Sequence, residues 1–158
     1  MAFRTEGHTF ILVTLHVVFG KKSKDRIAEL TQIAKWMRGW ADDTSDEYRQ
    51  NLMVLGDFNI DRKDDPNYKA FTSQGLSPAP GHDGLPRTLS SSGPDKFFDQ
   101  IAWFNDGGEA KLSFGVGRAN NFEWDRFVLK DLDRNQKSFR VSDHYPLWAE
   151  FLLPETKP

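Results

Sequence analysis

The segment Phe10–Phe19 constrains the fold more than any other part of the chain. It reads FILVTLHVVF, with β-branched, aliphatic and aromatic residues on both of its alternating faces. A strand with two apolar faces must be covered on both sides, so the sequence predicts a central strand of a sheet. Its only ionisable residue is His16. A lone histidine on such a face is more often a hydrogen-bonded core residue than a catalyst, so other parts of the chain must decide its role.

Helical and extended patterns alternate along the rest of the chain. Apolar residues recur at helical spacing within Lys24–Trp40, and Ser23 is a candidate N-cap, which predicts an amphipathic helix lying on the sheet. A weaker helical pattern covers Asp64–Gln74, and Gly75–Pro94 is rich in Gly, Pro and Ser, which predicts a long surface loop. Strands are expected at Leu52–Leu55, Phe97–Phe104 and Pro146–Leu153, with weaker ones at Lys111–Val116 and Phe122–Leu129.

Composition bounds the class of protein. A chain of 158 residues fits a single domain. The net charge is −2, so no global positive field attracts nucleic acid, and any contact with a polyanion must be local. The absence of cysteine excludes disulfides and zinc-thiolate sites and leaves the compartment open, with the cytoplasm slightly favoured. The sequence contains no run of roughly 18 apolar residues, so it predicts no membrane-spanning helix.

Four polar motifs lie where hydrophobic strands begin or end, which is typical of a site assembled from distant segments. They are Thr14-Leu15-His16, Gly56-Asp57-Phe58-Asn59, Asp99-Gln100-Ile101 and Ser142-Asp143-His144. Cleavage of a phosphodiester requires charge neutralisation, an activated water and a proton for the leaving oxygen. Carboxylate and amide groups at strand ends can hold Mg²⁺ and orient that water.

Asp57 and Asn59 are two residues apart, so in an extended segment their side chains point to the same side. Gly56 before them permits close approach of backbone or ligand. The alternative is that Asp-Phe-Asn forms a turn after a buried strand, which is the commonest use of Asp and Asn there.

Asp99 alternates with Ile101 and Trp103, which places a carboxylate on an apolar face where it needs a partner. A histidine, as the imidazolium or as a correctly oriented neutral imidazole, is the obvious partner. His8 and His82 have no companions at metal-ligand spacing and are interpreted as surface residues. The aromatic residues are more typical of a core, although Trp103, Phe122 and Trp124 are candidates for stacking on a substrate.

Together and in this order, the four motifs resemble the endonuclease/exonuclease/phosphatase family, in particular its deoxyribonuclease I-like branch, from about Phe10 to Phe151. The resemblance implies a four-layer αββα sandwich. In the family, a strand with an asparagine and a strand with a metal-binding glutamate precede the histidine strand, and neither is found here. We therefore expect residues 1–158 to be a single α/β (α+β) unit, the C-terminal half of the sandwich, with a mixed sheet, helices on one face and an open inner face.

The resemblance also implies roles for the site residues. Asp57 orients or deprotonates the attacking water, Asn59 hydrogen-bonds the phosphate, and His144, oriented by Asp99, contacts or protonates the scissile phosphate. His16 favours the deoxyribonuclease I-like branch. Asp143, with Asp57 and Asn59, would hold Mg²⁺ or Mn²⁺, weakly because the glutamate is missing.

The expected function is that of a metal-dependent phosphoesterase, with an endonuclease or exonuclease acting on phosphodiesters as the first choice and the isolated chain inactive or nearly so. Alternatives within the family are a phosphatase or a phosphodiesterase acting on phospholipids or inositol phosphates. A non-catalytic interaction module is the alternative from another class. The expected partners are nucleic acid or another phosphoester substrate, and a second copy of the chain that covers the open inner sheet face.

Overall fold

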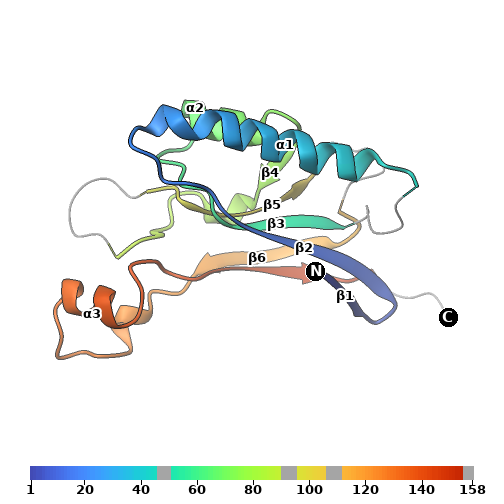
Figure 1. Cartoon of the computed structure of the whole chain (residues 1–158). Coiled ribbons are helices and arrows are strands. Elements are labelled where there is room, and N and C mark those ends of the chain that lie inside the picture. The colour runs from blue at the N-terminus through green and yellow to red at the C-terminus, as the bar shows by residue number, and fades with distance from the viewer. Residues whose placement is uncertain (46–50, 90–95, 106–111, 155–158) are drawn as a thin grey trace.

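Two helices lie on one face of a five-stranded sheet, a two-stranded sheet lies across its other face, and a third helix lies beyond one end of the smaller sheet, in the computed structural model of the chain (Figure 1). The structure describes residues 1–45, 51–89, 96–105 and 112–154. Its strands are β1 (Ala2–Thr5), β2 (His8–His16), β3 (Leu52–Asp57), β4 (Leu76–Pro78), β5 (Asp99–Phe104), β6 (Gly115–Asn121) and β7 (Leu147–Leu152). Its helices are α1 (Ile27–Asp42), α2 (Pro66–Thr72) and α3 (Arg134–Arg140), with short 3₁₀ turns at Ser23–Arg26, Pro80–His82 and Trp124–Arg126. None of the helices described is long and apolar enough to cross a membrane.

The larger sheet is mixed, as predicted. Its order is β1-β2-β3-β5-β4, with β2 and β3 parallel and the other neighbours antiparallel. The predicted central strand is confirmed, since β2 pairs on both edges. It ends at His16, however, and not at Phe19, because its partner β3 ends at Asp57, the residue paired with His16. Val18 and Phe19 beyond it are 67% and 62% exposed.

Helix α1 covers the sheet through one apolar stripe. Leu30, Ala34, Met37 and Ala41 are buried at three- and four-residue spacing, which confirms the predicted amphipathic helix. Ser23 is not its N-cap, because a 3₁₀ turn precedes the helix and the Ser23 hydroxyl donates to Asp61 instead.

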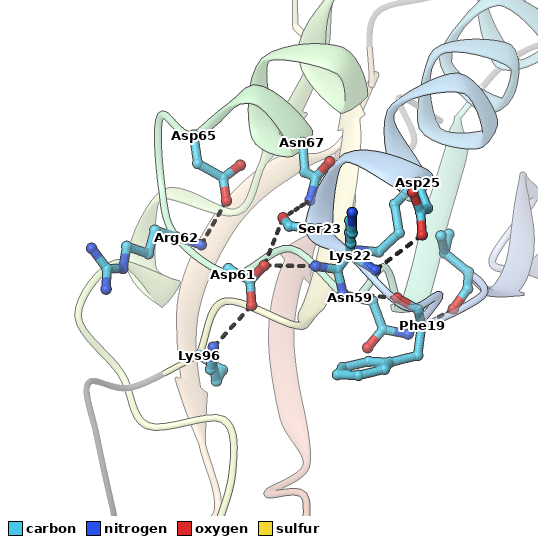
Figure 2. A network of polar contacts seen from close by, with 12 residues as sticks. Phe19, Lys22, Ser23, Asp25, Asn59, Asp61, Arg62, Asp65, Asn67 and Lys96 are labelled. Atoms are coloured by element: carbon cyan, nitrogen blue, oxygen red, sulfur yellow. Dashed lines mark hydrogen bonds and ion pairs between the residues drawn. The ribbon is translucent and has the colours of Figure 1, made fainter.

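A polar network joins the segment before α1 to the segment that follows β3 (Figure 2). The Asp61 carboxylate accepts hydrogen bonds from Arg26 at 2.6 Å, Ser23 at 2.8 Å and Lys96 at 2.9 Å. Burial opposes ionisation of Asp61, but these donors and the Arg26 charge outweigh it and lower its pKa. Asn67 in α2 donates to Ser23 at 2.8 Å, so the network also fixes the start of that helix.

The two-stranded sheet covers part of the inner face that the sequence led us to expect open. Met53 and Trp103 of the larger sheet pack with Phe114 and Phe151, and the Trp103 and Phe151 rings are 5.4 Å apart. The expectation of a bare inner face is therefore wrong over this part, because β6 and β7 fold back across it (Figure 1). The homodimer expected through that face stays a prediction.

The segment Gly75–Pro94, expected to be a surface loop, is largely built into the core. It contains β4 and a 3₁₀ turn, and its buried residues among those described are Leu76, Ala79, His82, Arg87 and Leu89. His82 was interpreted as a surface residue, yet it is 1% exposed and its Nε2 lies 2.9 Å from the Trp148 carbonyl oxygen. Residues 90–94 lie outside the part described.

The C-terminal third also differs from expectation. A single strand, β6, replaces the two weak strands expected at Lys111–Val116 and Phe122–Leu129; Lys111 itself lies outside the described residues. Helix α3 was not predicted, although Asp133 caps it and Gln136 completes a capping box, a signal that the sequence contained.

Strands β3 and β2 approach each other closely at Gly56. It has a φ of 139°, and a Cβ there would lie 2.0 Å from the Leu15 carbonyl oxygen. We predict that Gly56→Ala strongly destabilises the fold, because a backbone oxygen cannot move without breaking strand pairing. The matched control is Gly39→Ala in α1, where a Cβ meets nothing within 4 Å. This change should stabilise the protein by up to about 1 kcal/mol. Urea denaturation of both variants measures the difference, and equal midpoints would contradict it.

Candidate active site

Three side chains of the predicted site form one row across the larger sheet. In the strand register His16 pairs with Asp57, and Asp57 pairs with Asp99. Paired residues of adjacent strands project from the same face, with strands about 4.8 Å apart. The carboxyl ends of β2 and β3 and the amino end of β5 therefore bring these residues together from distant parts of the sequence.

The Asp57 carboxylate lies between two imidazoles. Its Oδ2 is 3.5 Å from His16 Nε2 and 4.0 Å from His144 Nε2. Its Oδ1 accepts a hydrogen bond from the Asn59 backbone nitrogen at 2.8 Å. Burial raises the pKa of Asp57 above its usual value, against the Asn59 hydrogen bond and the two imidazoles, with the nearby Asp99 charge adding to the increase.

The predicted contact between Asp99 and His144 is present. His144 Nδ1 lies 2.6 Å from Asp99 Oδ2, and both side chains are mostly buried. The hydrogen bond to Asp99 raises the pKa of His144, although burial acts in the opposite direction. With Nδ1 held by Asp99, the ring directs Nε2 toward Asp57.

Backbone contacts fix the loop that carries His144. The Ser142 hydroxyl accepts from the His144 backbone nitrogen at 3.0 Å, and the Trp124 indole donates to the His144 carbonyl oxygen at 3.0 Å. The Phe98 ring stacks beside the imidazole, with ring centroids 6.1 Å apart. His144 is therefore held through its backbone, ring face and Nδ1.

Asn59 differs from its predicted place. The strand ends at Asp57, and Asn59 has a φ of 51°, so the two do not continue one extended segment. Asn59 is 3% exposed and donates from Nδ2 to the Val17 carbonyl oxygen at 2.6 Å. The alternative considered from sequence was a turn after a buried strand; the chain leaves the strand here with the Asp57 carboxylate accepting from the Asn59 nitrogen, but no backbone turn is assigned to residues 58–60. The role of Asn59 in phosphate binding stays a prediction.

The part of the chain described does not by itself fit a metal ion. No group of three His, Asp or Glu side chains that could hold a cation is found among the described residues. Asp143 is exposed and its carbonyl oxygen accepts from the Leu89 backbone nitrogen at 2.7 Å. Asp57 is flanked by two imidazoles, and the neighbouring Asp99 carboxylate is engaged by His144, whereas Mg²⁺ prefers oxygen ligands.

A cavity of about 450 Å³ opens beside the dyad. Its lining includes Leu55, Asp99, Ile101, Phe122, Trp124, Val141, His144 and Pro146. Of the three aromatic residues considered for stacking, Phe122 is 48% exposed at this cavity and Trp124 is buried in its wall. Trp103 belongs to the core between the sheets.

Sequence reasoning missed Arg87, which is 1% exposed and donates from Nε to the Asp99 carbonyl oxygen at 2.8 Å. A single arginine in a segment rich in Gly, Pro and Ser is indistinguishable in sequence from a solvated one. The Pro86-Arg87-Thr88 stretch carried no pattern that could have revealed this burial.

Comparison with known sequences gives one curated relative and no matching family model. That relative, a deoxyribonuclease from Thioalkalivibrio sp. (strain K90mix), is 24% identical over 162 residues, which cover 94% of this chain and 41% of that protein. The match lies in its C-terminal part.

Solved structures with the same fold include a mannosyl-6-phosphatase from Bacteroides thetaiotaomicron VPI-5482, with a TM-score of 0.58 and 19% identity over 94% of this chain and 53% of that one. An endonuclease/exonuclease/phosphatase family protein from Leptotrichia buccalis C-1013-b has a TM-score of 0.56 and 19% identity over 96% of this chain and 52% of its own. An endonuclease/exonuclease/phosphatase family protein from B. thetaiotaomicron has a TM-score of 0.55 and 18% identity, over 92% of this chain and 51% of that one. The chain therefore has the fold of the endonuclease/exonuclease/phosphatase family and spans about half the length of the solved members it matches.

Proposed function

We propose that this chain carries part of the active site of a phosphoester hydrolase whose preferred substrate is a nucleic-acid phosphodiester. The observation that carries the proposal is the Asp57 carboxylate between the His16 and His144 imidazoles, with His144 held by Asp99. The deoxyribonuclease relative, which matches nearly all of this chain, supports a nuclease over other phosphoesterases.

The chemistry follows from the charges of these groups. A water attacks phosphorus and gives its proton to Asp57, whose raised pKa makes it a stronger base than an ordinary carboxylate. The bond from phosphorus to the ester oxygen breaks, and the leaving oxygen takes a proton from the His144 imidazolium. Asp99 favours this imidazolium, since it raises the pKa of His144. His16 donates from Nε2 to a non-bridging phosphate oxygen.

A phosphomonoester of a sugar is the second candidate substrate. One structure with the same fold is a mannosyl-6-phosphatase, and the groups named above act on the phosphate rather than on what it is attached to. A screen of plasmid DNA, RNA, mannose 6-phosphate, inositol phosphates and sphingomyelin discriminates among the substrates. No hydrolysis of any of them by the full-length protein would favour the non-catalytic module.

Metal binding gives a test on the chain itself. We propose that Mg²⁺ supports the reaction and that Asp57 and Asp143 supply only some of its ligands, because no three-residue cluster is present among the described residues. An ion that dehydrates reluctantly should then bind this chain weakly. Isothermal titration calorimetry with MgCl₂ should detect no micromolar site. A micromolar site abolished by Asp57→Asn would show that the chain holds a complete site.

The second test concerns His144. We predict that His144→Ala lowers kcat/KM of the full-length protein by about 10²- to 10⁴-fold, because it removes a proton donor at the scissile phosphate. The matched control is His8→Ala at the opposite end of strand β2, which should keep its activity. Circular dichroism of both variants checks folding. Retention of hydrolysis by a folded His144→Ala protein would refute the proposed role.

The third test concerns pH. Because the Asp99 hydrogen bond raises the pKa of His144, the imidazolium persists to higher pH than in the unfolded chain. The stabilising effect of this pair is thus full below the unfolded pKa and is lost as pH rises through the folded pKa. Asp99→Asn should lower the His144 pKa and move the alkaline limb of kcat to lower pH. NMR titration of the imidazole protons measures the shift, and His82, whose pKa burial lowers, is an internal reference. An unchanged His144 titration would contradict this account.

A further inference from the structure

Arg87 is a buried cation at the junction of the two sheets. Its side chain donates from Nε to the Asp99 carbonyl oxygen at 2.8 Å, from Nη2 to that of His82 at 3.0 Å and from Nη1 to that of Leu85 at 3.3 Å. The guanidinium carbon lies 3.7 Å from the centroid of the Phe97 ring. The residue is 1% exposed, so these contacts are made away from water.

The backbone of Arg87 and of the two residues after it contacts the loop that carries His144. Its carbonyl oxygen accepts from the Tyr145 backbone nitrogen at 2.9 Å. The next residue, Thr88, forms an antiparallel bridge with His144, and the Leu89 nitrogen donates to the Asp143 carbonyl oxygen at 2.7 Å. Residues 87–89 therefore pair with residues 143–145 through an isolated antiparallel bridge.

Arg87 therefore contacts the backbone of Asp99 and the backbone beside His144, the two residues of the acid–imidazole contact. The Arg87 side chain holds the backbone of Asp99 on β5, and its main chain holds the loop of His144 before β7. The contact they control, from His144 Nδ1 to Asp99 Oδ2, is only 2.6 Å long, so small shifts of either backbone change it.

We propose that Arg87 is a positioning residue that sets the separation of Asp99 and His144. This rests on the proposed function of the dyad, and it extends the site to a residue that touches no reacting atom. The planar guanidinium serves this purpose because its donors diverge toward several carbonyls while its face packs on Phe97. A lysine ammonium cannot reproduce both contacts at once.

The test compares Arg87→Lys and Arg87→Met with Arg118→Met. Arg118 is an exposed arginine whose side chain is 81% accessible and pairs with Glu150 on the neighbouring strand, so it controls for loss of a surface arginine. We expect both Arg87 variants to move the downfield NMR resonance of the His144 Nδ1 proton upfield in this chain, because the hydrogen bond to Asp99 lengthens. In the full-length protein, kcat should fall by about 10- to 100-fold at nearly constant KM, as for a misplaced catalytic group. Arg118→Met should change neither quantity.

A purely structural role predicts a different result. It would lower the thermal unfolding midpoint of the Arg87 variants while their folded state keeps the wild-type resonance of the His144 Nδ1 proton, and that outcome overturns the proposal. If Arg87→Met does not fold, Arg87→Lys is compared in the wild-type and Asp99→Asn backgrounds. The proposal requires the effect of Arg87→Lys on the Nδ1 proton resonance to shrink when Asp99→Asn has already weakened this hydrogen bond, and an effect of equal size in both backgrounds contradicts it. Because this resonance is recorded without turnover, it decides the point even if no substrate is hydrolysed.

Discussion

The register of three neighbouring strands is the constraint on which the site depends. Parallel pairing of β2 with β3 and antiparallel pairing of β3 with β5 place His16, Asp57 and Asp99 in one row. A slip of one residue in either pairing would turn one of these side chains to the helix-covered face. The register is itself held by the buried apolar residues of β2 and β3 beneath α1, and by Gly56, whose missing side chain lets the strands approach. The packing of the core therefore determines the geometry of the site in this fold.

The second sheet is tied to the first by the segment between β4 and β5. Here His82 meets the Trp148 carbonyl, the Pro86 carbonyl accepts from Asn121, and Arg87 joins the two halves of the candidate dyad. Polar side chains make these contacts with backbone carbonyls, which supplies partners to groups that would otherwise be buried at a cost. The candidate site thus sits where both sheets and this connecting segment converge, a place where a few buried hydrogen bonds control several elements.

Local patterns predicted the parts of the fold in which one element decides its own structure. The apolar run of β2, the stripe of α1 and the short strand before Gly56 were found because burial imposes a period on the sequence. Asp99 was expected to need a partner for the same reason, and the contact with His144 is present. Helix α3 was missed even though its capping box is visible, because its sequence lacks a strong apolar stripe.

What the sequence alone determined is the kind of chemistry available and the strands that carry it, since residue type and apolar period are local properties. Tertiary structure decided the rest. It turned Asn59 inward to the Val17 carbonyl, folded β6 and β7 over the inner face and buried Arg87 in a segment that reads as a loop. These outcomes depend on contacts between residues far apart in the chain. The residues next to a polar side chain in the sequence do not reveal whether its hydrogen-bond partner is water or a buried carbonyl. The physical reason is that desolvation is set by neighbours, which only the folded chain assembles.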